Sequence, residues 1–468
     1  MKKLLKKINL KRLPLIFLVV VFSVTFLLGL YANKYIFALI AFGIIYLLSF
    51  KCSIKKFPWF LFLFSMFSKI LVILVFKPPI ESDFYTMYRA SSMLKLGDLS
   101  YAKLPYFISW GYQTGHVAYQ ALLLKIWDSV FFLKLVNCLA LSGTTVLIYL
   151  TTKELINEKV AKFTSLSYMI YLHPVMLTTI LTNQHIPTFL FFLGLYLIIK
   201  DNLLNNKVWL KYLIVGLLIG LGNIMRPEGI IFVLAIIVYL LLNKCQKAHL
   251  KTIFINIVVL IASYLIITNG CSLAFKAFNI SQNGLKNMDP LWKFVLGTNY
   301  DSRGWYTSDD SKYLCDREKE LEVIKERTIG NPTKFLKLMM IKTKSFWLDS
   351  NLYWSNTYLN SNDLKVGSFK IKGSIVNAYM FKFNQHVYLV IFTLSLIGIF
   401  SLVKEKSYND KINLFVILLC GYWTVYLFIE IMNRYTYTPR VAVFIMAGIG
   451  INSIVTFMDS KRKVLNKK

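Results

Sequence analysis

The chain has 468 residues, of which 56% are hydrophobic and 16% charged, and its formal net charge is +31. Soluble globular proteins average about 45–50% apolar and about 25% charged residues. The apolar excess lies in runs of roughly 15 to 25 residues separated by Lys-rich segments, which is the pattern of repeated membrane spans. The composition therefore excludes a soluble enzyme, a secreted domain and a disordered scaffold.

Placing a helix wherever an apolar run is long enough to cross a bilayer predicts an all-α polytopic membrane protein with about twelve transmembrane helices. A Lys-rich start precedes the first run, but no small-residue cleavage site follows, so this run is interpreted as a retained helix rather than a secretory signal. The spans are expected at residues 13–31, 35–50, 57–76, 129–150, 163–181, 186–199, 212–223, 229–243, 252–270, 386–403, 412–430 and 441–458.

Lys and Arg are distributed unequally between the two sides of these spans. With a cytoplasmic N-terminus, most of them fall in the N-terminal segment, the short inner loops and the C-terminal tail. The four short outer loops hold only Lys34, Arg226, Arg434 and Arg440. This asymmetry predicts a cell-membrane protein with both termini in the cytoplasm. It also accounts for the basic net charge, so no nucleic-acid partner is expected, and the bilayer itself is the partner of these charges.

Two long hydrophilic segments then lie on the outer face, and chemistry is expected there because the inner loops are too short to form a domain. Ser82 is expected to cap a helix that runs to Leu96 and closes at Gly97, with Asp83 in its first turn. A second amphipathic helix is expected at residues 116–127. In the larger segment, helices are expected near residues 316–327 and from Asn331-Pro332 to Trp347.

Five regions follow from these boundaries. They are an N-terminal three-helix membrane segment (1–76), a first outer loop with interfacial helices (77–128), a central six-span region (129–270), a large outer loop domain (271–385), and a C-terminal three-helix segment with a basic tail (386–468).

Motifs for metals, nucleotides and redox chemistry are not found. The sequence has no Cys-x-x-Cys, no His-Glu-x-x-His and no Gly-rich nucleotide-binding loop, so no cofactor is expected and no metal site is indicated. Only Cys271 and Cys315 share the outer face. Their pairing cannot be deduced from sequence, and we expect them to be mostly unpaired.

An acidic pair, Glu81 and Asp83, follows an early span and opens an amphipathic outer helix. With this feature the sequence resembles the GT-C superfamily of membrane glycosyltransferases, closest to its bacterial protein-mannosyltransferase-like and aminoarabinose-transferase-like branch. Residues 223–229, which contain an Arg-Pro turn, residues 290–305, and residues 434–439 before the last span are also similar to that branch. One departure is that two extra helices precede the acidic loop, but an added pair leaves the loop on the same face.

The resemblance implies transfer of a sugar from a polyprenyl-phosphate donor to a cell-envelope glycan acceptor on the outer face, with inversion at the anomeric carbon. It places the catalytic carboxylate at Asp83, with Glu81 as its acidic neighbour. A general base contributes about 10²–10⁴-fold to such a reaction. The alternative for Asp83 is an ordinary carboxylate at a helix start.

Three outer arginines are candidates for binding the donor phosphate, because the planar guanidinium donates two parallel hydrogen bonds. They are Arg226, Arg434 and Arg440. Arg226 could instead form a salt bridge with Glu228 or Glu430. Arg434 and Arg440 could instead contact lipid headgroups by snorkelling.

Four further side chains are weaker candidates for substrate contacts, and for each of them a structural role is the alternative. They are His185, Gln184, His116 and Trp305. Three rival functions also stay open: a flippase or transporter of lipid-linked glycans, a glycan polymerase or ligase, and a non-catalytic assembly partner. The polymerase model expects dependence on Arg or His of the large loop and indifference to Asp83. The sequence does not determine the sugar, the acceptor, metal dependence or oligomeric state.

Overall fold

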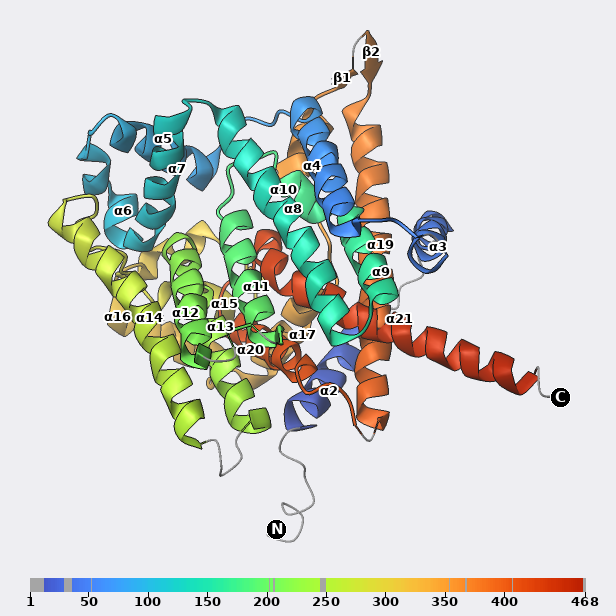
Figure 1. Cartoon of the computed structure of the whole chain (residues 1–468). Helices are drawn as coiled ribbons and strands as arrows, with labels where there is room; N and C mark the ends of the chain where they lie inside the picture. The colour runs from blue at the N-terminus through green and yellow to red at the C-terminus, as the bar shows by residue number, and fades with distance from the viewer. Residues whose placement is uncertain are drawn as a thin grey trace.

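The computed structural model describes residues 12–28, 36–51, 53–201, 203–204, 207–244, 250–352, 354–366, 368–405 and 407–465. The basic segment 1–11 and Lys34, which entered the orientation argument, lie outside these residues. Long helices make up most of the described chain (Figure 1), and its strands form one small two-stranded sheet. The predicted class, an all-α polytopic membrane protein, is confirmed.

Eleven of the twelve predicted spans coincide with apolar helices. Of the described helices, six are long and apolar enough to cross a membrane, and five more are apolar but shorter. The eleven helices are α2 (Leu13–Leu28), α3 (Ile36–Phe50), α4 (Phe57–Val75), α8 (Val130–Leu155), α11 (His185–Ile199), α12 (Val208–Met225), α13 (Gly229–Tyr239), α14 (Leu250–Ala277), α19 (Gly373–Lys404), α20 (Ile412–Phe428) and α21 (Tyr437–Leu465).

The span predicted at 163–181 is divided into α9 (Glu158–Met169) and α10 (Leu172–Leu177). Pro174 lies in the first turn of α10, where its missing N–H costs nothing, so proline begins a new helix here instead of continuing the old one. The freed N–H of His173 donates to Oδ1 of Asn384 on α19 at 3.0 Å. Apolarity alone could not reveal this break.

The first outer segment forms α5 (Ser82–Lys95), η2 (Ser100–Lys103), α6 (Pro105–Ser109), η3 (Gly111–Gln113) and α7 (Thr114–Ile126). The expected helix at 82–96 is present, and Gly97 closes it with a φ of 83°. The predicted cap is wrong, because Glu81 occupies the N-cap position, without a side-chain cap bond, and Ser82 is already the first helical residue.

Close packing holds this segment over the turn between α12 and α13. A Cβ atom on Gly115 of α7 would lie 1.6 Å from the carbonyl oxygen of Ile224, near the end of α12. Only glycine permits the two backbones to approach this closely. The contact therefore fixes the first outer segment next to Arg226, which follows α12 directly.

The larger outer segment contains α15 (Trp292–Thr298), η7 (Ser308–Tyr313), α16 (Arg317–Thr328), α17 (Pro332–Trp347), α18 (Trp354–Ser361) and an antiparallel hairpin of β1 (Leu364–Val366) and β2 (Phe369–Ile371). The helices expected near 316–327 and from 331–332 to Trp347 are thus confirmed as α16 and α17. Asn331 caps α17 by accepting the N–H of Lys334.

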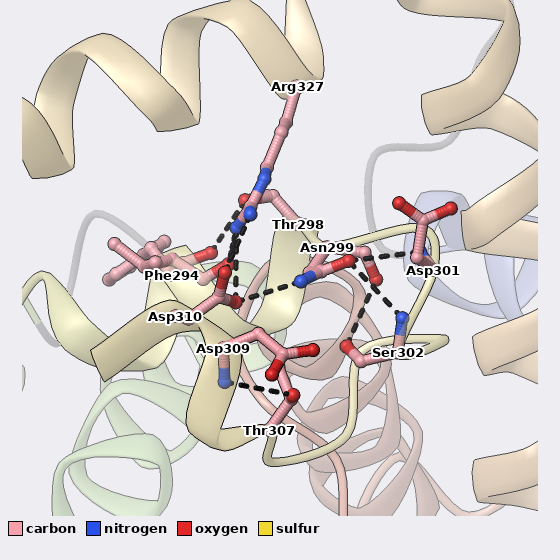
Figure 2. A network of polar contacts seen from close by, with 10 residues as sticks. Phe294, Thr298, Asn299, Asp301, Ser302, Thr307, Asp309, Asp310 and Arg327 are labelled. Carbon is pink, nitrogen blue, oxygen red and sulfur yellow. Dashed lines mark hydrogen bonds and ion pairs between the residues drawn. The ribbon is translucent and has the colours of Figure 1, made fainter. Parts of the chain in front are cut away.

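A largely buried ion pair between Arg327 and Asp310 fastens α16 to η7, and the same arginine also reaches α15 (Figure 2). Arg327 donates from Nη2 to Oδ1 of Asp310 at 2.7 Å and from Nη1 to Oδ2 at 3.2 Å. The same guanidinium reaches the carbonyl of Val295 at 2.9 Å, and Asn299 donates to Asp310 at 2.9 Å. Because Val295 belongs to α15, this network fixes the helix that carries Lys293.

Candidate functional site

A cavity of about 340 Å³ opens where six parts of the chain meet. They are the first half of α5, η3, the segment before α11, the turn between α12 and α13, the start of α15 with the residues before it, and the segment from the end of α20 through η8 (Asn433–Thr436). The charged residues that line the cavity are Asp83, Arg226, Glu228, Lys293, Glu430 and Arg434. Three residues predicted from separate parts of the sequence, Asp83, Arg226 and Arg434, therefore share one cavity.

Each cation in the cavity is paired with a carboxylate. Arg434 contacts Asp83, with 3.1 Å between Nη2 and Oδ2. Arg226 pairs with Glu228, and Lys293 pairs with Glu430. The salt bridge that was the alternative for Arg226 is thus present, and its partner is Glu228.

Asp83 is the accessible carboxylate of this set. Its side chain is 39% exposed, whereas that of Glu228 is 7% exposed and that of Glu430 is 3% exposed. Within the described chain, Oδ2 of Asp83 accepts from Arg434, and no donor is assigned to Oδ1. The Asp83 carboxylate can therefore contact a bound substrate without a conformational change that exposes it.

The Arg226–Glu228 pair is held from several sides. Glu228 accepts hydrogen bonds from the hydroxyls of Tyr422 at 2.8 Å and Tyr426 at 3.4 Å, both on α20. Arg226 also donates from Nη1 to Oδ1 of Asn183 at 3.2 Å. A buried pair with this many partners keeps its charges and its geometry.

The ring of Tyr435 brings the three cations together. Arg226 lies 5.1 Å from its centroid, Lys293 5.6 Å and Arg434 5.6 Å, all within cation–π range. Nζ of Lys293 also lies 3.3 Å from the Tyr435 hydroxyl. Three fixed cations around one ring form a site that suits a phosphate group.

Lys293 keeps its charge although its side chain is only 31% exposed. Burial alone would lower the pKa of this ammonium, but Tyr435, Glu430 and Tyr112 around it raise the pKa well above its ordinary value. Tyr112 also lines the cavity, and burial raises the pKa of its hydroxyl, so it stays protonated as a hydrogen-bond donor.

Arg440 lies outside this cavity, in contrast to the prediction that it binds phosphate with Arg434. Its guanidinium donates to the Tyr171 hydroxyl at 2.6 Å, to Ser350 at 3.1 Å, and to the carbonyls of Phe346 at 3.2 Å and Asp349 at 2.7 Å. The side chain is 1% exposed and lies over the ring of Tyr388. These contacts fit a structural role.

The other predicted residues also lie apart from the lining. Glu81 is exposed at the start of α5, and Trp305 packs half-buried against the core. His185 is fully buried, and its Nδ1 lies 3.0 Å from the hydroxyl of Tyr437. Gln184 and His116 are buried and absent from the lining.

Sequence reasoning missed several residues of the cavity. They are Tyr112, Asn183, Lys293 and Tyr435. Glu430 was considered only as a partner of Arg226, and it pairs with Lys293 instead. Asn183 is the direct neighbour of Gln184, and Lys293 belongs to the stretch 290–305, so the signals were present but were assigned to other residues.

No group of three or more His, Cys, Asp or Glu side chains could hold a metal ion in the part of the chain that the structure describes. Cys271 and Cys315 are both free thiols.

Residues 116–271 match the family model of dolichyl-phosphate-mannose-protein mannosyltransferases. This stretch carries Asn183, Arg226 and Glu228 of the cavity. No curated protein matches the chain. The match confirms the resemblance to the GT-C superfamily of membrane glycosyltransferases.

Among solved structures, the chain is similar to the oligosaccharyltransferase AglB from Archaeoglobus fulgidus in complex with an inhibitory peptide and a dolichol-phosphate. The identity is 13% and the TM-score 0.47, over 88% of this chain and 52% of that one. It is also similar to ArnT from Cupriavidus metallidurans bound to undecaprenyl phosphate. There the identity is 12% and the TM-score 0.41, over 86% of this chain and 78% of that one. This chain spans about half the length of the archaeal enzyme.

Proposed function

We propose that this protein is a membrane glycosyltransferase that moves a sugar from a polyprenyl-phosphate donor to a cell-envelope glycan or related acceptor at the extracytoplasmic face. One observation carries the proposal: an accessible carboxylate, Asp83, shares a cavity with three cations gathered around Tyr435. The name of the matched family, which describes transfer from dolichyl-phosphate-mannose, supports the choice of a lipid-phosphate donor.

In this reaction Asp83 is the general base. Oδ1 accepts the proton of an acceptor hydroxyl while the hydroxyl oxygen attacks the anomeric carbon of the donor sugar. The bond from that carbon to the phosphate oxygen breaks on the opposite face, so the configuration is inverted and polyprenyl phosphate leaves. Arg226, Lys293 and Arg434 stabilise the charge that develops on the phosphate.

Donor binding also frees the base. Without a donor, Asp83 is the counterion of Arg434 at 3.1 Å. A phosphate placed among the cations competes for Arg434, so the carboxylate is released to face the acceptor. The buried carboxylates Glu228 and Glu430 stay with their own cations throughout.

An apolar groove of about 570 Å³ lies beside the charged cavity and suits the isoprenoid tail of the donor. It is lined by side chains of α2, α13 and α20, and by Leu242 just after α13. Its lining includes Thr424 and Val425, and the next residue of α20, Tyr426, lines the charged cavity. The tail would thus stay in the membrane while the phosphate reaches the cations.

The test uses the purified full chain in lipid nanodiscs with a panel of undecaprenyl-phosphate sugars, and measures the undecaprenyl phosphate released. Asp83→Asn should lose at least about a hundredfold in activity, the scale expected for a general base. Asp128→Asn is the matched control, because Asp128 lies in the same outer segment and is 66% exposed.

Three outcomes would contradict the proposal. Equal activity of native protein and Asp83→Asn would remove Asp83 from the chemistry. Dependence on Arg or His of the large loop with indifference to Asp83 would favour a polymerase or ligase. Movement of lipid-linked glycan across the bilayer without turnover of any donor would favour a flippase.

A further inference from the structure

A single buried lysine joins the large outer segment to the end of α20. Lys342 lies on α17 and is 1% exposed. Its Nζ donates to the carbonyl oxygens of Gly297 at 2.8 Å, Leu427 at 2.7 Å and Ile429 at 2.8 Å. Burial lowers the pKa of Lys342 to about 7, and its ammonium form has three protons, one for each of these carbonyls.

The three carbonyls lie where two helices end. Gly297 is in the last turn of α15, and Leu427 and Ile429 are at the end of α20. Carbonyls in the last turn of a helix lack intrahelical partners, and a cation there is favourable. Lys342 therefore satisfies both helix ends at once and holds them against each other.

This junction is too tight for a side chain. A Cβ atom on Gly297 would lie 2.2 Å from the carbonyl oxygen of Phe428. Beside it, the backbone N–H of Glu430 donates to the carbonyl of Lys293 at 2.8 Å. The backbones that carry the Lys293–Glu430 pair are thus bound directly to one another.

The junction controls where two residues of the cavity lie. Lys293 is one helical turn before Gly297 on α15, and Glu430 follows Ile429 directly. Lys342 acts on both through the backbone, because their positions depend on the carbonyls of Gly297 and Ile429 that it holds. A shift of either helix end would separate the pair or move it away from Tyr435.

We infer that Lys342 is a positioning residue of the donor site: from the large outer segment it holds Lys293 and Glu430 in the geometry that receives the donor phosphate. This inference rests on the proposed function. It adds α17 to the parts of the large outer segment that support the donor site, beside α15 with Lys293.

The test measures the Kd of undecaprenyl phosphate and the donor KM, kcat and thermal midpoint, all for the full chain in nanodiscs. Lys342→Met should raise Kd and KM by at least about tenfold and also lower the midpoint, because three carbonyls lose their partner. Lys342→Arg keeps a cation, so its Kd, KM and thermal midpoint should lie between those of the native protein and those of Lys342→Met. Lys337→Met is the matched control, because Lys337 is exposed on the same helix and loses the same charge.

A purely structural lysine would behave differently. It would lower the midpoint and the active fraction, seen as a lower apparent kcat, while Kd and KM stay within about twofold of the native values. That result in Lys342→Met would overturn the inference. If Lys342→Met does not fold, the same result in Lys342→Arg overturns it.

A double-mutant cycle between Lys342 and Glu430 gives an independent test of the positioning role. Glu430→Gln removes the counterion of Lys293 and should tighten phosphate binding in the native background. In the Lys342→Met background Lys293 and Glu430 are already displaced from the donor site. Glu430→Gln should therefore alter the Kd of undecaprenyl phosphate by less than about twofold in that background. Equal effects in both backgrounds would refute the positioning role. A native chain that neither binds undecaprenyl phosphate nor turns over a donor would instead refute the proposed function.

Discussion

The contact between Asp83 and Arg434 predicts that one substitution changes binding and catalysis in opposite directions. Asp83→Asn removes the negative charge that occupies Arg434 at 3.1 Å. A donor phosphate then no longer competes with a carboxylate, so undecaprenyl phosphate should bind more tightly. The same substitution removes the base, so sugar transfer should fall.

The size of the binding effect follows from the exposure of the two side chains. Two unit charges about 4 Å apart interact by about 1 kcal/mol in water and by about 4 kcal/mol at the dielectric of a protein surface. Exposed pairs measure only about 0.2–1 kcal/mol. The Asp83 side chain is 39% exposed and that of Arg434 is 10% exposed. The interaction energy of this pair should therefore lie at the upper end of the range for exposed pairs, below the value of about 4 kcal/mol at a protein surface. We expect about 1 kcal/mol, which is roughly a fivefold decrease in Kd.

Binding of undecaprenyl phosphate to nanodisc-embedded protein checks this prediction, with donor turnover measured on the same samples. Raising the salt concentration should reduce the difference between native protein and Asp83→Asn, since the pair is partly exposed. Asp128→Asn should change neither quantity. Equal or weaker phosphate binding by Asp83→Asn would show that the carboxylate does not compete with the donor, and would refute the proposed exchange of partners.

Three further predictions concern other groups. Arg440→Met should destabilise the fold by about 1–3 kcal/mol for each buried hydroxyl or carbonyl left without its donor, with a lower thermal midpoint and an unchanged phosphate Kd per folded molecule. Tyr435→Leu removes the ring shared by the three cations and should weaken undecaprenyl phosphate binding several-fold in the same nanodisc assay. Glu320 is a buried residue of α16, and burial together with a hydrogen bond with Asp289 raises its pKa from 4.5 to about 8. The pKa of Glu320 is higher in the folded state than in the unfolded state. The contribution of Glu320 to the free energy of unfolding is therefore fully present below pH 4.5 and is lost as the pH rises through 8. Glu320→Gln should therefore flatten the fall of the thermal midpoint over that range.

Membrane topology explains why much of the site could be predicted from the sequence. Charges in short outer turns between apolar spans are costly and usually have a specific role. That reasoning selected Arg226 and Arg434, and the structure places both in one cavity with Asp83. Hydropathy likewise located eleven of the helices, because an apolar run of bilayer length rarely occurs outside a membrane span.

A change of helix type separates the two arginines before the last span. Arg434 lies in the 3₁₀ helix η8, whereas Arg440 lies in the first turn of α21, so the two side chains do not follow one helical face. The sequence places both near the outer end of the last span, but only the start of α21 at Tyr437 shows that Arg440 points into the core. Lys293 was missed for a different reason: the stretch 290–305 was singled out, but which of its side chains lines the cavity depends on how a long loop folds back.

The charge balance of the cavity suits the proposed reaction at the membrane boundary. Uncompensated charge there would be expensive to bury, and each cation is indeed paired. A polyprenyl-phosphate sugar is a diester with one negative charge, and the released monoester carries up to two. The acceptor proton neutralises Asp83 in the same step, so one negative charge disappears at the base as one appears on the phosphate. Arg434, which contacts Asp83 before the donor binds and the donor phosphate afterwards, then holds that new charge. Exchange of partners at this one arginine thus keeps the cavity's net charge constant from donor to product.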